Sequence, residues 1–234
     1  MNYLLDISGV LLLLPLIYFV VYAGKHLHKH ENTYYIIIGL ISFIAGVLAV
    51  IAQVIDYNIQ LENPVLYTLF FQGHLTLPFF ILVMYAGAFK KKSKAKLTLM
   101  KVRRELAVIG FLFLIPHAVY LVWLALTNLN PTGTIAFLIM VPLFITSFTQ
   151  IRKKMHPLKW RKLHKWAYPA YAMIYLHIAS ITIIFNLMNN EGTELIWGFI
   201  RFGIYTVIFG LYTYLKFKND VFAKKTQPKV QKPA

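Results

Sequence analysis

The chain of 234 residues contains no cysteine. Disulfide bonds, thiolate metal sites, iron–sulfur clusters and thioether-attached haem c are therefore excluded. Charged residues are also scarce, at 14%, whereas 59% of the residues are hydrophobic and 16% are aromatic. In soluble domains about a quarter of the residues are charged. A lipid bilayer is therefore the expected solvent for this chain.

Acidic residues are the scarcest charged type, with 8 against 24 lysines and arginines, and the formal net charge is +16. In a soluble protein such an excess would suggest nucleic-acid binding. Here the basic residues gather in the segments 90–104 and 152–165 and in the C-terminal tail, between long apolar runs. That distribution is typical of the cytosolic side of a membrane protein, so no nucleic-acid partner is expected.

Seven apolar segments are near the length of about 20 residues that crosses a bilayer. The segments that connect them are alternately rich in lysine and arginine and devoid of both. We therefore predict an all-α integral membrane bundle of seven transmembrane helices in the cell membrane, with the N-terminus outside and the C-terminus in the cytosol. The predicted spans are 3–23, 33–55, 64–89, 105–127, 132–151, 165–187 and 194–217.

The predicted organisation has three parts. Residues 1–63 form two N-terminal transmembrane helices, and residues 64–217 form the transmembrane core. Residues 218–234 are basic and poor in apolar residues, which predicts a disordered cytosolic tail. The sequence contains no glycine-rich phosphate loop, nucleotide fingerprint or metalloprotease motif, so no soluble catalytic domain is expected.

Ionisable residues inside a span are costly and usually functional. His74, His117 and His177 lie within predicted spans, and His164 lies at a cytosolic boundary. The helical rise puts His117 and His177 both at about 18 Å from the cytosolic face. Arg201, seven residues into the last span, either reaches the outer interface or neutralises an anion such as a haem propionate.

Two imidazoles at one depth on different helices are what haem b requires, because its iron binds an axial nitrogen on each side of the ring. The interior is poor in carboxylates, which disfavours a zinc or di-iron site. The alternative is that each imidazole only hydrogen-bonds a neighbouring helix. His26, His28 and His30, in KHLHKHE, are expected to form a solvated cytosolic face rather than a metal site.

Three segments resemble the ferric-reductase-like transmembrane domain family. KVRRELAVIGFLFLIPHAVYLV (101–122) resembles its Arg-Arg, Leu-Gly and histidine-containing helix. TSFTQIRKKMHPLKWRKLHKWAYPAYAMIYLH (146–177) resembles its Thr-Ser, basic loop, Trp-x-x-Leu-His and later histidine. GHLTLPFFILVMYAGAFKKK (73–92) resembles the preceding helix. The similarity extends over about residues 65–215, and the nearest branch is the bacterial MsrQ (YedZ) haem subunit.

The resemblance implies a membrane b-type cytochrome that is the electron-transfer subunit of an oxidoreductase and has no nucleotide or flavin domain of its own. In that family the histidines that match His117, His164 and His177 are linked to haem. One haem b between His117 and His177 is expected, with a second on His164 as the alternative. No residue pattern supports a flavin or a quinone, although either is compatible with this role.

The resemblance also implies the partners. A cytosolic flavin reductase or quinol would donate electrons, and an extracytoplasmic reductase would accept them, in MsrQ systems a molybdenum enzyme that reduces methionine sulfoxide. Two alternatives stay open. The same scaffold serves as a component of a ferric or other extracellular reductase. A protein of another class, a haem-free seven-helix transporter or sensor, would use His74, His117 and His177 to bind protons or a ligand.

The chain departs from the family pattern at three points. It has an extra predicted helix before the shared core, it carries His74, and Arg103 and Arg104 stand where two-haem relatives have a histidine before His117. On one ideal helix, His164 and His177 would point about 140° apart. Pro169, between them, would have to kink or unwind that helix before both could face one side.

Overall fold

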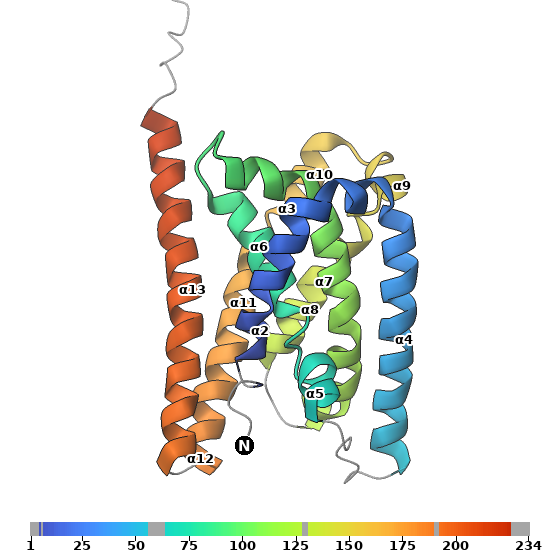
Figure 1. The fold of residues 1–234 in the computed structure, drawn as a ribbon, viewed down its shortest axis with the longest axis vertical. Coiled ribbons are helices and arrows are strands. Elements are labelled where there is room, and N and C mark those ends of the chain that lie inside the picture. The colour runs from blue at the N-terminus through green and yellow to red at the C-terminus, as the bar shows by residue number, and fades with distance from the viewer. Residues whose placement is uncertain (1–4, 6, 56–63, 128–130, 190–191, 226–234) are drawn as a thin grey trace, which may run out of the picture.

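Every regular element of the computed structural model is a helix within the residues that it describes, which are 5, 7–55, 64–127, 131–189 and 192–225 (Figure 1). The elements, in chain order, are α2 (Ser8–Leu11), α3 (Leu13–Lys29), α4 (Glu31–Ile55), α5 (Pro64–Leu66), the π-helical turn η1 (Tyr67–Phe71), α6 (Leu77–Ala88), α7 (Lys94–Thr127), α8 (Pro131–Ile145), α9 (Thr149–Arg152), α10 (Pro157–His164), α11 (Ala167–Ser180), the π-helical turn η2 (Ile181–Phe185), α12 (Asn186–Asn189) and α13 (Gly192–Lys225).

Four helical stretches within the described residues are long and apolar enough to cross a membrane: Ser8–Lys29, Glu31–Ile51, Lys94–Leu121 and Gly192–Asp220. Many of their large apolar side chains are exposed, as is usual for helices that face lipid. The prediction of an all-α, multi-pass membrane protein is confirmed at this level.

The other three predicted spans are divided among shorter elements. Segment 64–89 contains α5, η1 and α6, segment 132–151 contains α8 and α9, and segment 165–187 contains α11 and η2. Of these pieces, α6 and α8 are apolar helices of less than spanning length.

The basic segments that connect the predicted spans were expected to be loops, but they are largely helical. α7 begins at Lys94, and its first turns lie across one end of the bundle (Figure 1). α10 occupies much of segment 152–165, and only His30 separates α3 from α4. The physical reason is composition, because lysine, arginine, leucine and methionine are all good helix formers.

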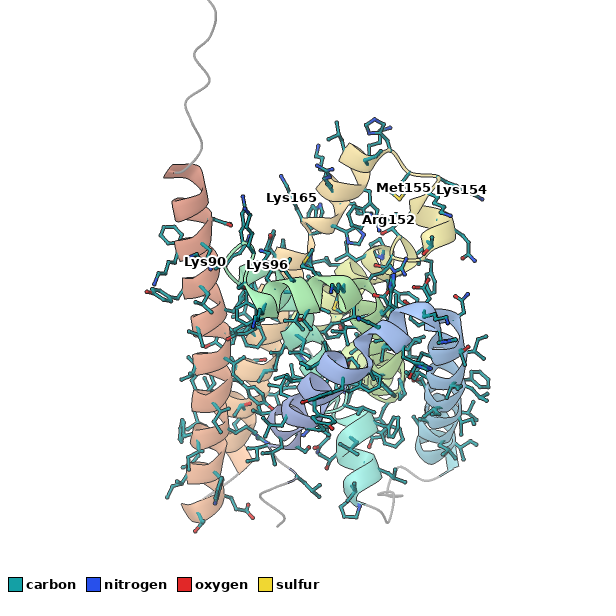
Figure 2. The ribbon with its side chains drawn as sticks, turned by 45° about the horizontal axis from the view of Figure 1, so that its top comes forward. Lys90, Lys96, Arg152, Lys154, Met155 and Lys165 are labelled. Carbon is teal, nitrogen blue, oxygen red and sulfur yellow. The ribbon has the colours of Figure 1, made fainter. Side chains whose placement is uncertain are left out.

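The basic residues gather at one end of the bundle. Figure 2 shows Lys90, Lys96, Arg152, Lys154 and Lys165 together at that end, although they come from different parts of the chain. Positive charge concentrated at one end is the expected mark of a cytosolic face. We call this the basic end of the molecule.

α13 runs along the edge of the bundle and packs against α6 and α11 (Figure 1). The helix continues to Lys225, so the first part of the predicted disordered tail is helical. The rest of that predicted tail, 226–234, lies outside the described residues.

α7 is the central helix, and α3, α4, α6 and α8 all pack against it. The approach of α6 is closest at Gly110, where an added Cβ would lie 2.8 Å from Cβ of Phe79. The hydroxyl of Thr76 donates a hydrogen bond to the carbonyl of Gly110 at the same contact. A small residue at position 110 is therefore needed for α6 and α7 to pack.

The helix breaks between η1 and α6, and Gly73 makes the break possible. Gly73 has a φ of +76°, a conformation that residues with a Cβ rarely adopt. An added Cβ there would also lie 3.3 Å from Cγ and Nδ1 of His117 on α7. The break therefore lies directly against the imidazole of His117.

Substitution of Gly110 by alanine is expected to destabilise the protein by about 1–3 kcal/mol, because Cβ of Phe79 belongs to a packed helix and cannot move aside cheaply. The matched control is Gly39→Ala on α4, where an added Cβ meets nothing within 4 Å. That control should be neutral or slightly stabilising, by up to about 1 kcal/mol. Thermal unfolding in detergent, followed by circular dichroism, measures both. Equal midpoints for the two variants would contradict the close contact.

Candidate functional site

A mainly apolar cavity of about 290 Å³ lies between the start of α6 and helices α7, α8 and α11. His117 and His177 both line it, and we call it the histidine cavity. Its wall also includes Gly73 and Gly133, and Phe80 and Met140 close it on one side. Apolar walls around a small number of polar groups are typical of cofactor sites.

The hydrogen bond of His117 determines which of its ring nitrogens carries a proton. Nδ1 lies 2.6 Å from the carbonyl oxygen of Phe71, at the end of η1. A carbonyl oxygen only accepts, so Nδ1 carries the proton and donates. Nε2 is then left as a lone-pair donor, and the backbone bond holds the ring in one orientation, as in proteins whose histidines ligate a metal.

His177 projects from α11 and is held close to α8. An added Cβ on Gly133 would lie 2.6 Å from Nδ1 of His177, so a larger residue there would displace the imidazole. Nδ1 is buried and has no hydrogen-bond partner among the described residues. A buried polar atom without a partner costs about 1–3 kcal/mol, which favours a ligand or a rearrangement that satisfies it.

The two imidazoles face a common space. The ring centres of His117 and His177 lie 6.2 Å apart, with an angle of 75° between the ring planes. Two metal–imidazole bonds of about 2 Å, added to the half-widths of the rings, place two axial imidazoles about 6 Å apart. The separation is therefore one at which both imidazoles could hold the same metal ion. The glycines, the orphaned nitrogen and the apolar walls fit haem.

The structure does not bring His74 and Arg201 into this cavity. Nδ1 of His74 lies 2.9 Å from the hydroxyl of Ser8 and 3.1 Å from the carbonyl oxygen of Leu5. His74 therefore holds the N-terminal helix against the break before α6. Arg201, on α13, lies near enough to His74 to act on it electrostatically.

His164 lies at the end of α10, in a second environment. Its Nε2 is 3.1 Å from the hydroxyl oxygen of Thr146, and that hydroxyl is 2.6 Å from the carbonyl oxygen of Pro142. The hydroxyl proton is directed to the carbonyl, so Thr146 accepts from Nε2–H of His164. The ring of Trp160 packs on the imidazole, with 4.1 Å between ring centres. The ring nitrogen that would most simply bind iron is therefore already engaged.

Burial lowers the pKa of His164 to about 4, and the positive charges of Arg103 and Arg152 contribute to this shift. His164 lies outside the predicted spans but is neutral at physiological pH. A neutral imidazole agrees with its role as a donor to Thr146.

His164 and His177 lie on different helices, so the angle of about 140° calculated for one continuous helix does not apply to them. α10 ends at His164 and α11 begins at Ala167. The chain therefore turns before Pro169, which lies in the first turn of α11, where a missing N–H costs nothing. The two histidines line different cavities.

A second cavity, of about 530 Å³, lies at the basic end, and we call it the cytosolic cavity after the orientation that is proposed below. His164 lines it together with Arg103, Arg104, Arg152 and Arg161, and no carboxylate is among its described lining residues. The guanidinium of Arg152 lies 4.7 Å from the centre of the Trp160 ring. Phe80 and Met140 line both cavities and so separate them. A cavity lined by arginines and by apolar side chains suits an anionic ligand that also has an apolar part.

The sequence reading missed one polar network at this end. Arg104 contacts both Glu31 and Glu105, and Glu105 also contacts His28. In the sequence, Glu105 marks only the start of a predicted span. The signal that could have identified it is chemical, since a carboxylate at the edge of an apolar span needs a partner.

The fold and the histidine cavity define a helical membrane protein with a candidate cofactor site inside its bundle. Residues 89–175 match the model of the family described as ferric reductase like transmembrane component, which confirms the predicted resemblance over that segment. The matched segment contains His117 and His164 and ends just before His177.

One curated protein, an uncharacterized protein of Treponema pallidum (strain Nichols), is 27% identical to this chain over 160 residues. The alignment covers 62% of this chain and 43% of the relative, so the chain spans less than half of that protein's length. No solved structure matches the chain.

Substitution of Thr146 by valine tests the contact that engages His164. The change leaves the Nε2–H of His164 without its partner, whereas the Pro142 carbonyl keeps the backbone N–H of residue 146, so we expect a loss of about 1–3 kcal/mol in stability. The matched control is Thr213→Val on α13, whose hydroxyl is bonded only to the Phe209 carbonyl of its own helix. That control should change stability by less than about 0.5 kcal/mol. Chemical denaturation in detergent measures both, and equal effects would contradict the assignment.

Proposed function

We propose that the protein is a membrane b-type cytochrome that passes electrons from the cytosolic side of the bilayer to an extracytoplasmic acceptor. The paired imidazoles of His117 and His177 carry this proposal, because they combine a 6.2 Å ring separation with an orphaned buried nitrogen. The family match over residues 89–175 supports a membrane electron-transfer component.

His117 and His177 would hold haem b through their imidazole nitrogens. Haem, when bound, supplies a centre that gains and loses one electron. His117 is pre-oriented by its bond to the Phe71 carbonyl, and Gly133 leaves room for the ring of His177. Apolar neighbours such as Phe80, Leu114 and Phe137 would exclude water from the site.

One haem per chain is favoured over two. Nε2 of His164 is engaged by Thr146, and Arg103 and Arg104 stand near it, with no second histidine among the described lining residues of that cavity. His164 is then best assigned to electron entry. The cytosolic cavity would receive electrons from a flavoprotein or a quinol, and its cations complement an acidic or anionic donor.

The proposed topology has seven spans, with the N-terminus outside and the C-terminus in the cytosol. The basic end in Figure 2 supports this orientation, because lysine and arginine accumulate on the cytosolic side of membrane proteins. In this orientation the cytosolic cavity faces the donor and the histidine cavity lies nearer the outer face.

The acceptor follows from the nearest branch of the resembled family, in which an extracytoplasmic methionine sulfoxide reductase receives the electrons. A ferric or other extracellular reductase role on the same scaffold is the alternative that the family description supports. Two activities of cells that express the protein distinguish these roles. One is the reduction of external Fe³⁺, and the other is the reduction of methionine sulfoxide by an extracytoplasmic partner enzyme.

Purified protein and overexpressing membranes are expected to show a reduced-minus-oxidised haem b spectrum. His117→Ala and His177→Ala should each abolish or strongly shift the Soret band, because each removes one axial ligand. His30→Ala is the matched control, since His30 is exposed at the basic end, and its spectrum should equal that of the wild type. An unchanged spectrum in both ligand variants would refute the assignment, and absence of pigment would favour the haem-free transporter or sensor.

The number of haems has its own test. The wild type should contain one haem per chain, and His164→Ala should retain it, because His164 lies in the other cavity. Pyridine haemochrome content per mole of protein measures the ratio. A ratio near two that falls to one in His164→Ala would show that the cytosolic cavity also holds haem.

A further inference from the structure

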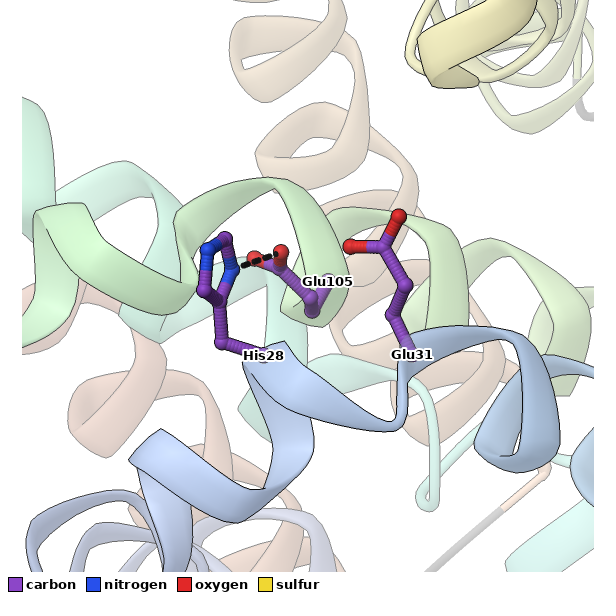
Figure 3. A group of neighbouring side chains, drawn as sticks. All are labelled: His28, Glu31 and Glu105. Atoms are coloured by element: carbon purple, nitrogen blue, oxygen red, sulfur yellow. Dashed lines mark hydrogen bonds and ion pairs between the residues drawn. The ribbon is translucent and has the colours of Figure 1, made fainter.

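Three polar side chains converge at the basic end, outside the histidine cavity. His28 comes from the end of α3, Glu31 from the start of α4 and Glu105 from α7 (Figure 3). Nδ1 of His28 lies 2.7 Å from Oε1 of Glu105. One potential ligand atom from each residue lies within 4.8 Å of those of the other two. We call these residues the cytosolic triad.

Arg104 supplies the positive charge that the cytosolic triad requires. Its Nη2 lies 2.7 Å from Oε1 of Glu105 and also contacts Oε2 of Glu31. Two carboxylates this close repel each other unless a cation or a proton lies between them. The guanidinium therefore supplies to the two carboxylates the positive charge that a metal ion would bring.

A second observation points to a ligand other than arginine. The side chain of Glu105 is 1% exposed, and its Oε2 has no hydrogen-bond partner in the described part of the chain. The hydroxyl of Tyr35 is likewise buried without a partner. Tyr35 lines a cavity of about 280 Å³ together with Glu31 and Arg104. The site therefore has an unsatisfied carboxylate oxygen on Glu105, and a cavity that could hold water adjoins it on the side of Glu31.

The donor set determines the class of ion. One imidazole and two carboxylates suit divalent ions of the first transition row, whereas copper(I) would prefer thiolates, and calcium would prefer an all-oxygen shell. Metal–ligand bonds of about 2.0–2.2 Å bring ligand atoms to about 3–4 Å from one another. Around an ion, the 2.7 Å contact between His28 and Glu105 therefore has to open slightly, and separations of up to 4.8 Å within the triad have to shorten by about 1 Å.

We propose that His28, Glu31 and Glu105 bind a divalent metal ion such as Zn²⁺, Fe²⁺ or Mn²⁺, and that Arg104 takes its place in the metal-free protein. The displaced guanidinium could move into the cytosolic cavity, because Arg104 also lines that cavity. Metal binding would clamp α3 and α4 onto α7 and add a positive charge to the cavity that contains His164. The site does not depend on the presence of haem.

Titration calorimetry with Zn²⁺ on the full-length protein in detergent tests the site. The background should carry His26→Gln and His30→Gln, because these two exposed rings lie 4.5 Å apart and can bind zinc by themselves. In that background we expect one zinc ion per chain. His28→Gln and Glu31→Gln should each weaken binding by about tenfold or more, since even outer partners of metal ligands have effects of that size.

Arg104→Gln provides the discriminating variant. It removes the competing cation, so Zn²⁺ should bind more tightly than in the background protein, whereas a merely structural ion-pair cluster would predict no such gain. Glu194→Gln, an exposed carboxylate at the start of α13, is the matched control and should leave the affinity unchanged. His28 and Glu31 are not fully buried, so their variants avoid the folding risk of changing Glu105.

Three results would overturn the proposal. One is zinc binding that disappears in the His26→Gln/His30→Gln background. Another is an affinity that is unchanged in both His28→Gln and Glu31→Gln. The third is weaker zinc binding in Arg104→Gln. The heat of zinc binding is measured independently of absorbance, so a failure of the haem assignment would not imitate any of them.

Discussion

The hydrogen bond from Nδ1 of His117 to the carbonyl of Phe71 joins the fold to the site. A bilayer offers no water to satisfy the backbone groups that a broken helix releases, so the protein must supply partners for them. The imidazole of His117, on α7, supplies such a partner to the backbone carbonyl of Phe71, where η1 ends. Gly73 then lets the chain turn against the ring, and α6 begins beside it. The same contact orients the imidazole and opens the wall of the histidine cavity.

The two cavities differ in chemistry because only one of them lies at the basic end of the molecule. The histidine cavity is lined mainly by apolar side chains, whereas four arginines line the cytosolic cavity. Phe80 and Met140 line both cavities, so the two cavities are neighbours. This arrangement agrees with the proposed function, in which charge enters at the basic end and an apolar site holds the redox centre.

The N-terminal helices are bound to the rest of the protein by polar as well as apolar contacts. α3 and α4 pack on α7, and Arg104 joins Glu31 of α4 to Glu105 of α7. The short basic stretch between the first two spans therefore contributes to a folded polar cluster. An arginine with two carboxylate partners at a membrane boundary is suited to exchange with a metal ion, because both carry positive charge to the same oxygens.

Sequence reasoning succeeded where the relevant physics is local. Hydrophobic length identified four helical stretches that are long and apolar enough to cross a membrane, among seven predicted spans. Charge placement identified the basic end, and the motifs in 101–122 and 146–177 identified the family that matches residues 89–175. Helical rise also put His117 and His177 at one depth, and the structure places their rings 6.2 Å apart. It was less successful with the basic segments, because loops and surface helices share the same residues.

The sequence by itself determined that the chain belongs in a lipid bilayer, that one end is basic, and which histidines lie within apolar segments. Each of these depends on residue type and on position along one segment. The tertiary structure alone decided what each histidine contacts. His117 meets the Phe71 carbonyl, His164 donates to Thr146, and His28 meets Glu105. These pairs lie on different elements, up to 77 residues apart in the chain. Their contacts depend on how the helices pack, which no periodicity within a single segment records.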